Sequence, residues 1–167
     1  MRIALTILKR IKTFFLTKLC LFLARINGSN VYVNGYSKFT KNTILGKNVH
    51  FNGIDISGKG KVVIGDNFHS GSECLIITSV HNYEGTKIPY DETSIDKDVH
   101  IGDNVWIGKR VVVLGGVNIG EGAIVQAGSC VVNDIPPLAI AGGHPAKVFK
   151  FRNSDHYFEK KSKNLYF

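Results

Sequence analysis

An aliphatic residue occupies every sixth position between residues 101 and 131. The set is Ile101, Ile107, Val113, Ile119, Val125 and Val131. A small or β-branched residue follows each of the first five members four places later, and these residues are Val105, Val111, Val117, Ala123 and Ser129. An isolated helix spaces its apolar residues by about 3.6 and an isolated strand alternates them by about 2, so neither element explains the period. A short strand followed by a turn explains it, provided that successive units stack on one another.

Stacked units of this kind form a parallel β-helix. Each six-residue unit makes one flat face of a triangular coil, and its aliphatic residue points into the coil. The corners between faces need residues that tolerate positive φ, and glycine and asparagine supply them. The candidate corner residues are Gly102, Asn104, Gly108, Gly115, Gly116, Gly120 and Gly122. A flat parallel sheet is the alternative, and it is disfavoured because no helical crossover separates the repeats.

The same period runs through the earlier part of the chain. It joins Val33, Phe39, Leu45 and Phe51, and it returns at Ile64, Ser70 and Ile76. The interval between Phe51 and Ile64 holds one residue more than two units, which predicts a bulge or a loosened corner within residues 53–60. Leu45, Ile64 and Ile101 are each followed by Gly, by Lys or Asp, and by Asn, which predicts the same turn at all of these points.

Two segments carry a resemblance to a known family. They are IGDNFHSGSECLIITSVHNYEG at residues 64–85 and VHIGDNVWIGKRVVVLGGVNIGEGAIVQAGSCVVNDIPPLAIAGGHPAKV at residues 99–148. Through them the chain resembles the hexapeptide-repeat acyltransferases, in particular the sugar O-acetyltransferases typified by galactoside and maltose acetyltransferase. The resemblance implies an all-β fold, a left-handed parallel β-helix, although parallel strand connections generally prefer the right hand. It also implies a homotrimer with active sites between subunits and acetyl-CoA as the acetyl donor, without a metal ion.

The repeat is interrupted between Ile76 and Ile101, and a loop is expected over residues 82–98. Loops on a rigid scaffold often carry function. His81 opens this loop, and the resemblance places it on the histidine of the family's T-x-H segment. Histidine suits general base catalysis because its pKa lies near neutrality. No Ser or Cys nucleophile has a plausible partner, so direct transfer with His81 as the base is preferred; the alternative is a loop histidine without a role.

The resemblance also implies positions for the cofactor. Carried over residue by residue, it implicates Trp106, Lys109, Ala127, Gly128, Lys147 and Lys150. Trp106 is expected to point outward from its coil. Lys147 and Lys150, together with Arg152, can meet phosphate groups, and a solvated surface patch is the alternative. Val132 and Asn133 depart from the polar and basic pair of many relatives.

The acceptor is less constrained by the sequence. Asn52 lies near the position where sugar acetyltransferases of this type use an asparagine, so it is the candidate substrate-binding residue. A surface-polysaccharide, lipid-linked or nucleotide sugar precursor is the expected acceptor. An N-acetyltransferase of an amino sugar and a non-catalytic β-helix binding module are the alternatives. A metal enzyme of the γ-carbonic anhydrase type is disfavoured, because His81 has no histidine four or five residues later.

Residues 1–30 are expected to form an amphipathic helix before a β-helix domain at 31–148 and a tail at 149–167. Residues 1–25 contain six basic residues and no acidic one. The apolar residues Ala4, Leu8, Ile11, Phe15, Leu19 and Phe22 fall on one stripe of the helix. The charge-free runs are too short for a membrane span or a signal peptide. The stripe is expected to pack on the β-helix or on a neighbouring subunit, and contact with an anionic membrane surface is the alternative.

The composition bounds the remaining possibilities. A chain of 167 residues is long enough for one domain with a sizeable core. The net charge of +8 favours an acidic partner such as a nucleotide-bearing cofactor or a membrane surface. Nucleic acid is disfavoured because the basic residues gather at the two ends without interleaved aromatics. Three cysteines without paired spacing argue against a disulfide framework or zinc site. A cytoplasmic location is expected, with the inner membrane face as the peripheral alternative.

Overall fold

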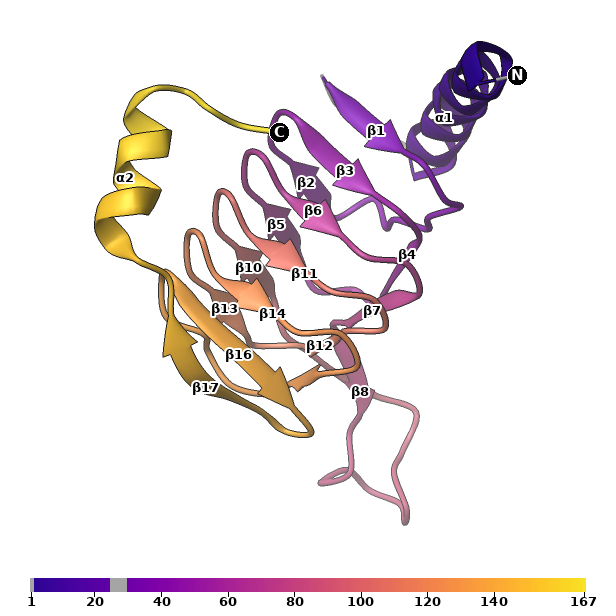
Figure 1. The fold of residues 1–167 in the computed structure, drawn as a ribbon. Coiled ribbons are helices and arrows are strands. Elements are labelled where there is room, and N and C mark those ends of the chain that lie inside the picture. The colour runs from indigo at the N-terminus through magenta and orange to yellow at the C-terminus, as the bar shows by residue number, and fades with distance from the viewer. Residues whose placement is uncertain (1, 25–29) are drawn as a thin grey trace.

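The computed structural model describes residues 2–24 and 30–167, which form a triangular solenoid with a helix beside each end (Figure 1). Face 1 contains β1 (Val31–Val33), β3 (Val49–Phe51), β6 (His69–Ser70), β11 (Trp106–Ile107), β14 (Ile124–Val125) and β16 (Ala139–Gly143). Face 2 contains β4 (Ile54–Ser57), β7 (Cys74–Ile77), β12 (Val112–Leu114) and β15 (Cys130–Val131). Face 3 contains β2 (Thr43–Leu45), β5 (Val62–Ile64), β10 (Val99–Ile101) and β13 (Asn118–Ile119).

The strands within each of these faces are parallel, and the chain visits face 1, face 2 and face 3 in turn. In Figure 1 the strands of face 1 run from left to right in front, and the chain returns behind them while the coils descend. This path is a left-handed coil. The predicted fold, a left-handed parallel β-helix of hexapeptide repeats with an N-terminal helix, is confirmed.

The core of the solenoid is built from the residues that the period predicts to point inward. The later coils bury Ile101, Ile107, Val113, Ile119, Val125 and Val131, and also the residue two places before each member of this series. Facing strands are in register, so that Ile107 lies between Ser70 and Val125. Burying an aliphatic side chain contributes roughly 1.5 to 3 kcal/mol, and stacking aligns these contributions along the solenoid axis.

The corner between face 3 and face 1 repeats the same turn. Asn48, Asn67 and Asn104 all have positive φ, between 54° and 58°. Their side chains form a ladder, because the Asn48 amide nitrogen donates to Asn67 at 2.9 Å and the Asn67 amide nitrogen donates to Asn104 at 2.9 Å. Asparagine therefore serves two purposes here: it tolerates the left-handed backbone and it joins adjacent coils.

The extra residue between Phe51 and Ile64 loosens the corner, as predicted. On face 2, Ile56 of β4 pairs with Ile76, so Ile56 is the inward residue of this coil. It comes five residues after the inward Phe51, and the next inward residue, Ile64, comes eight residues after Ile56 instead of six. Gly53 and Gly58 flank β4 with φ of 124° and 99°. The additional residue is thus absorbed outside the core.

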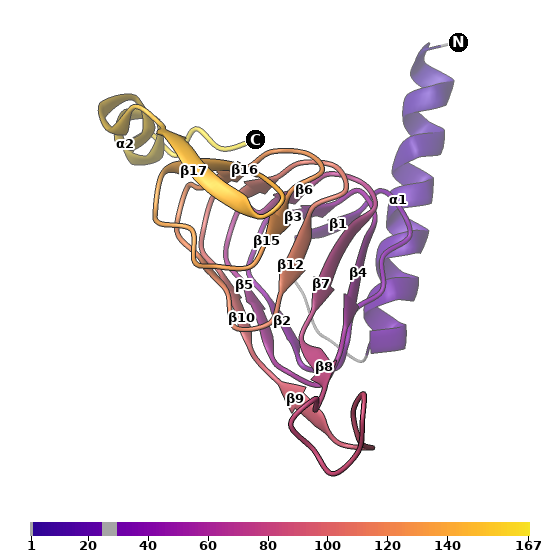
Figure 2. The ribbon, with the colours of Figure 1, turned by 90° about the horizontal axis from the view of Figure 1, so that it is seen from below.

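One insertion leaves the solenoid. β8 (Ser79–His81) pairs antiparallel with β9 (Ser94–Asp96), so that Val80 faces Ile95 and His81 faces Ser94. This hairpin projects from the corner between face 2 and face 3, and Figure 2 shows it at one vertex of the triangular cross-section. The expected loop at residues 82–98 is therefore a hairpin whose base begins at Ser79.

The helix α1 (Arg2–Ala24) packs against β1, but not through the expected stripe. Cys20 and Ala24 are buried, whereas Leu8, Ile11, Phe15, Leu19 and Phe22 are exposed. The side chain of Ala4, the remaining member of the expected stripe, lies outside those described. The expectation that this stripe packs on the β-helix of the same chain is wrong. The reason is that β1 is an edge strand with unpaired backbone groups. The Thr17 hydroxyl accepts a hydrogen bond from the Val33 N–H at 2.9 Å, and the Thr13 hydroxyl donates to the Asn34 side chain at 2.9 Å.

The other end of the solenoid is covered by β17 (Ala146–Phe151), which runs antiparallel to β16. The tail then forms α2 (Ser154–Ser162), whose N-cap residue Asn153 accepts a hydrogen bond from the His156 N–H at 2.8 Å. Tyr157 is buried, and its hydroxyl donates to Glu121 at 2.8 Å. Neither α1 nor α2 is both long enough and apolar enough to cross a bilayer.

The asparagine ladder predicts a graded response to substitution. Asn67→Ala should lower the free energy of unfolding by about 2 kcal/mol, because it removes both hydrogen bonds of the ladder. It also places alanine at a positive φ, which alanine tolerates less well than asparagine. Asn67→Gly should cost about 1 kcal/mol less than Asn67→Ala, since glycine adopts this φ freely. Urea unfolding at one protein concentration measures both values. Equal losses would mean that backbone conformation contributes nothing at this corner.

Candidate active site

His81 is the last residue of β8, where the hairpin has left the solenoid. Its side chain is exposed, and its imidazole stacks on the phenol ring of Tyr90 with centroids 3.8 Å apart and planes 10° apart. Stacking restrains the plane of the imidazole and leaves its edge accessible. Within residues 2–24 and 30–167 neither imidazole nitrogen has a hydrogen-bond partner. The ring is therefore able to accept a proton from an incoming group.

Asp91 organises the hairpin tip that carries Tyr90. It is buried, and its carboxylate accepts hydrogen bonds from the backbone N–H of Thr86 at 2.9 Å and of Thr93 at 2.8 Å. The Thr93 hydroxyl donates to the same carboxylate. The hydrogen bonds from the Thr93 side chain and from the Thr86 and Thr93 backbone lower the pKa of Asp91 to about 2. An ionised Asp91 thus fixes the chain on both sides of Tyr90.

A second group of candidates lies along the corner between face 1 and face 2. Asn52 follows β3 at this corner, and Lys109 follows β11, two coils farther along the chain. The Asn52 side chain joins neighbouring coils, because its amide nitrogen donates to the Ser70 carbonyl at 2.7 Å and its oxygen accepts from Asn34 at 3.2 Å. A groove of about 400 Å³ beside Asn52 is also lined by Tyr36 and Glu73.

Lys109 is ion-paired on this surface. Its Nζ lies 2.8 Å from one carboxylate oxygen of Glu73, and the Arg110 Nε lies 2.6 Å from the other. The hydrogen bonds from Lys109 and Arg110 lower the pKa of Glu73. Exposed ion pairs contribute little to stability because water and salt screen them, so an anionic ligand can compete for Lys109 at little cost.

Ala127 and Gly128 lie on the same corner, two and three residues after the end of β14. Gly128 has a φ of 73°, and a Cβ added there would meet no atom within 4 Å, so its outer side is open. Its N–H donates to the Lys109 carbonyl at 2.8 Å, and its own carbonyl lies 3.1 Å from the His144 Nδ1. The buried Ser129 hydroxyl accepts from the Gly143 N–H at 3.2 Å. These contacts hold the corner against the turn that joins β16 to β17.

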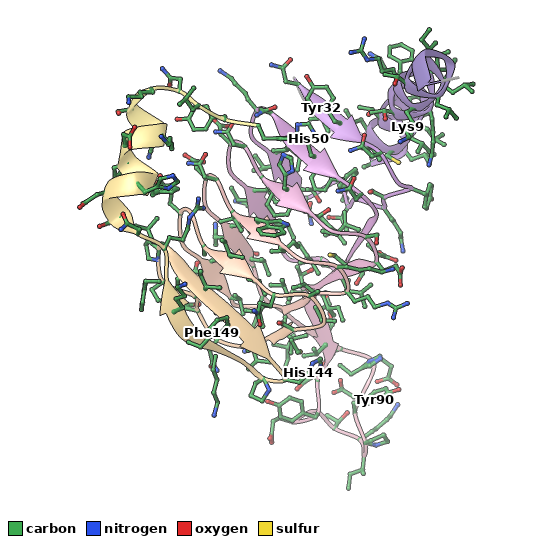
Figure 3. The ribbon with its side chains drawn as sticks, viewed as in Figure 1. Lys9, Tyr32, His50, Tyr90, His144 and Phe149 are labelled. Atoms are coloured by element: carbon green, nitrogen blue, oxygen red, sulfur yellow. The ribbon has the colours of Figure 1, made fainter. Side chains whose placement is uncertain are left out.

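The remaining cofactor candidates lie elsewhere on the chain. Trp106 is on the outer side of face 1, where it is exposed and stands in register with His69 and Ile124. Lys147 and Lys150 are exposed on β17, opposite Gly142 and Ile140. Figure 3 labels His144 in the turn between β16 and β17, and Phe149 on β17.

A single chain does not bring all of these residues together. Asn52, Lys109, Ala127 and Gly128 share one corner. Lys147 lies on β17, just after the turn whose residues Gly143 and His144 contact this corner. His81 belongs to the hairpin at a different corner, and Figure 2 shows β8 and β9 at a vertex away from β17. The predicted base and the predicted cofactor residues are therefore separated within one chain.

The other histidines divide into two groups. His100, His144 and His156 are exposed. His50 and His69 are half-buried and stack on each other, with ring centroids 4.3 Å apart. Burial and, to a smaller degree, the His69 imidazole lower the pKa of His50 to about 4. Among the described residues no group of three or more His, Cys, Asp or Glu is placed to hold a metal ion.

Sequence reasoning missed Tyr90, Asp91 and Glu73. Tyr90 lies in an irregular loop, and no periodicity links it to His81. Glu73 could have been found, because it precedes Arg110 by 37 residues, which is the spacing that pairs β7 with β12. The contact of His144 with Gly128 was also missed, and no sequence signal predicts it, since it depends on how the turn between β16 and β17 folds back.

The hydrogen bonds that Asp91 accepts from the Thr86 and Thr93 N–H groups, here called the Asp91 clamp, predict a local effect of substitution. Asp91→Ala should speed deuterium uptake in the peptide 82–93 roughly tenfold or more, because two backbone hydrogen bonds to a carboxylate are lost. Hydrogen-exchange mass spectrometry measures this, and Glu92→Ala is the control because the Glu92 carboxylate is ion-paired with the exposed Lys87. In the wild type the protection should be complete above the ordinary pKa of 3.8 and should disappear as pH falls through about 2. Unchanged uptake in Asp91→Ala would exclude the clamp.

Comparison with known proteins relates this arrangement to a family. Residues 98–133 match the family model for the bacterial transferase hexapeptide (six repeats). The chain is 32% identical over 138 residues to the galactoside O-acetyltransferase of Escherichia coli, which covers 80% of this chain and 68% of that protein. An acetyltransferase-like relative from Saccharomyces cerevisiae is 37% identical over 116 residues, covering 69% of this chain and 59% of the relative.

A solved structure agrees with this relationship. The hexapeptide-repeat acetyltransferase from Vibrio cholerae, crystallised with acetyl-CoA, superposes with a TM-score of 0.62 at 29% identity, covering 71% of this chain and 64% of that one. The chain thus spans less than two thirds of the length of this protein and of the yeast relative. The ordered repeats, the solenoid they form and the extent of the match to the galactoside enzyme show that the chain belongs to the hexapeptide-repeat acetyltransferases.

Proposed function

We propose that this protein is an acetyl-CoA-dependent O-acetyltransferase that transfers acetyl to a sugar hydroxyl, with His81 as the general base. The observation that carries the proposal is the exposed imidazole of His81, which is stacked on Tyr90 and has free ring nitrogens in the described chain. Similarity to a galactoside O-acetyltransferase supports the acceptor class. Similarity to an acetyltransferase that was crystallised with acetyl-CoA supports the donor.

The proposed transfer needs one proton relay and no covalent enzyme intermediate. His81 takes the proton of the acceptor hydroxyl while that oxygen attacks the thioester carbonyl of acetyl-CoA. The carbon–sulfur bond then breaks, and the CoA thiolate leaves and receives the proton from His81. Thiols are acidic, so the leaving group needs little assistance. Backbone N–H groups are suited to stabilise the oxyanion that forms during the attack.

The proposed assembly is a homotrimer with its active sites between subunits. Its support is the separation of the two groups of candidate residues on one chain. His81 projects on a hairpin from one corner, while Lys109, Ala127 and Gly128 line another. A neighbouring copy that presents its own corner to the hairpin would complete a site with both groups. A stable monomer in solution would contradict this arrangement.

The proposed donor site uses the corner between face 1 and face 2. The open side of Gly128 allows close approach of a ligand to the backbone, and Lys109 can exchange Glu73 for a phosphate. Lys147 and Lys150 are exposed on β17 and can meet the remaining phosphates. Trp106 lies on face 1, so its proposed contact with the cofactor requires the ligand to reach across that face.

The proposed acceptor is a sugar of a surface polysaccharide or its lipid-linked or nucleotide-linked precursor. Asn52 is the candidate acceptor contact, and its hydrogen bonds with the Asn34 side chain and the Ser70 carbonyl hold the Asn52 amide in a fixed orientation. Assays with free sugars, nucleotide sugars and lipid-linked glycans identify the acceptor. Transfer to an amine alone would contradict O-acetylation.

Acetyl-CoA should bind with a stoichiometry near one per chain in isothermal titration calorimetry. Lys147→Ala should weaken binding about tenfold, because it removes a charged contact to a phosphate. Lys41→Ala is the matched control, since Lys41 is an exposed lysine before β2 and away from the proposed groove. Absence of binding at millimolar acetyl-CoA would instead indicate a β-helix without donor chemistry.

His81→Ala should lower kcat roughly 10² to 10⁴-fold, the usual effect of removing a general base, and should leave acetyl-CoA affinity nearly unchanged. Steady-state kinetics with the acceptor from the screen measures kcat, and calorimetry measures the affinity. His100→Ala is the control, because His100 is exposed on face 3 and has no proposed role. A His81→Ala enzyme with near-normal kcat would remove His81 from the mechanism.

A further inference from the structure

The outer side of α1 carries a continuous apolar stripe. It consists of Leu8, Ile11, Phe15, Leu19 and Phe22, whose side chains are 46 to 79% exposed. At 3.6 residues per turn these positions fall on the side of the helix opposite Thr13, Thr17, Cys20 and Ala24, which face the solenoid. The solenoid therefore leaves the most apolar side of α1 uncovered. Contiguous exposed apolar surface of this kind marks an interaction site.

The charges of α1 restrict the partner. The helix contains no acidic residue. By helical periodicity, Lys12 lies on one flank of the stripe and Lys18 on the other. The Lys18 Nζ lies 5.9 Å from the centroid of the Phe14 ring, and Lys18 also lines the groove between α1 and β1. Lysines in such positions extend their aliphatic stems along an apolar surface and place the ammonium group at a polar boundary. The stripe with its flanks is thus complementary to a surface that is apolar inside and anionic at its edge.

The inner side of α1 adds to the same charge. Lys9 and Arg10 line a groove of about 910 Å³ between α1 and β1, whose lining also includes Tyr32 and His50 and no carboxylate among the described residues. Figure 3 shows Lys9 on the helix and Tyr32 and His50 on the adjacent strands. Basic groups therefore surround the helix on the side that faces the solenoid as well as on the flanks of the stripe.

The placement of α1 leaves the stripe accessible to a flat surface. Figure 2 shows the helix along one edge of the solenoid, with its N-terminal half extending beyond the coils. Its 23 residues span about 35 Å at 1.5 Å per residue. Figure 1 shows the hairpin that carries His81 at the bottom of the view, away from α1 at the upper right, so contact along α1 leaves the hairpin at a distance.

We propose that α1 is a peripheral membrane anchor that lies in the interface of an anionic bilayer. Leu8, Ile11, Phe15, Leu19 and Phe22 enter the boundary between headgroups and acyl chains, and Lys12 and Lys18 meet the anionic headgroups. A second copy of this chain is a poorer partner for the stripe. It carries the same net charge of +8 and the same acid-free helix, so a symmetric contact through α1 would oppose like charges. This proposal does not depend on acetyl transfer.

The experiment is flotation of the full-length protein with liposomes of phosphatidylcholine alone and of phosphatidylcholine with 30 mol% phosphatidylglycerol. The wild type should float with the anionic liposomes and remain largely unbound with the neutral ones. The double variant Phe15→Ser/Phe22→Ser should lower the partition coefficient roughly tenfold or more, because two large apolar side chains no longer enter the interface. Phe151→Ser/Phe158→Ser is the matched control, since these exposed phenylalanines lie at the far end of the chain.

A second pair of variants tests the electrostatic contribution. Lys12→Glu/Lys18→Glu should lower partition onto anionic liposomes roughly tenfold or more, and its effect should shrink as salt rises. Lys41→Glu/Lys47→Glu changes the net charge by the same amount at exposed sites outside α1, and it should bind like the wild type. Circular dichroism of each variant checks that the solenoid is intact.

Three outcomes would overturn the proposal. The first is no flotation of the wild type on either liposome. The second is flotation of Phe15→Ser/Phe22→Ser equal to that of the wild type. The third is a change in oligomeric state, measured by light scattering, on Phe15→Ser/Phe22→Ser without any change in flotation, which would assign the stripe to contact between copies. None of these readouts requires acetyl-CoA or an acceptor, so failure of the anchor leaves the acetyltransferase proposal standing.

Discussion

The hydrogen bonds between successive coils constrain everything else in this molecule. Each strand of a face pairs with the strand one coil away, so every coil must return to the same position after a nearly fixed length of chain. Ile107 pairs with Val125, eighteen residues later, and Val113 pairs with Val131 at the same distance. Corners must therefore turn the chain by the same angle each time. The left-handed asparagines Asn48, Asn67 and Asn104 meet this demand at one corner, and their side chains repeat the register in a second set of hydrogen bonds.

This constraint also decides where variable segments can lie. An extra residue within a face would move inward side chains outward, whereas an extra residue at a corner only enlarges the turn. The additional residue before Ile64 and the hairpin that carries His81 both occur at corners. The candidate chemistry follows the same logic: Lys109 and Gly128 are corner residues, and His81 lies on a corner insertion. The faces supply rigidity, and the corners supply functional groups.

The sequence predicted those features that depend on period and failed on those that depend on contacts between unlike elements. The inward ladder, the repeated corner and the position of the insertion follow directly from the spacing of six. The stacking of Tyr90 on His81 has no periodic signal, because it is created inside an irregular hairpin. The orientation of α1 was missed because hydropathy alone favoured burial of Phe15 and Leu19. The Val33 N–H on this edge strand instead selected the side of the helix that carries Thr17, whose hydroxyl accepts its hydrogen bond.

The two ends of the solenoid differ from its middle in a way that bears on polymer growth. A parallel β-helix is open at both ends, and its terminal coils could in principle add further chains as a fibril does. At one end α1 lies against β1 and engages its backbone through Thr17. At the other end β17 reverses direction along β16, so the final strand no longer continues the parallel pattern. Both terminations lie outside the repeat. Duplication of one eighteen-residue coil would therefore lengthen the solenoid while leaving both ends closed to axial polymerisation.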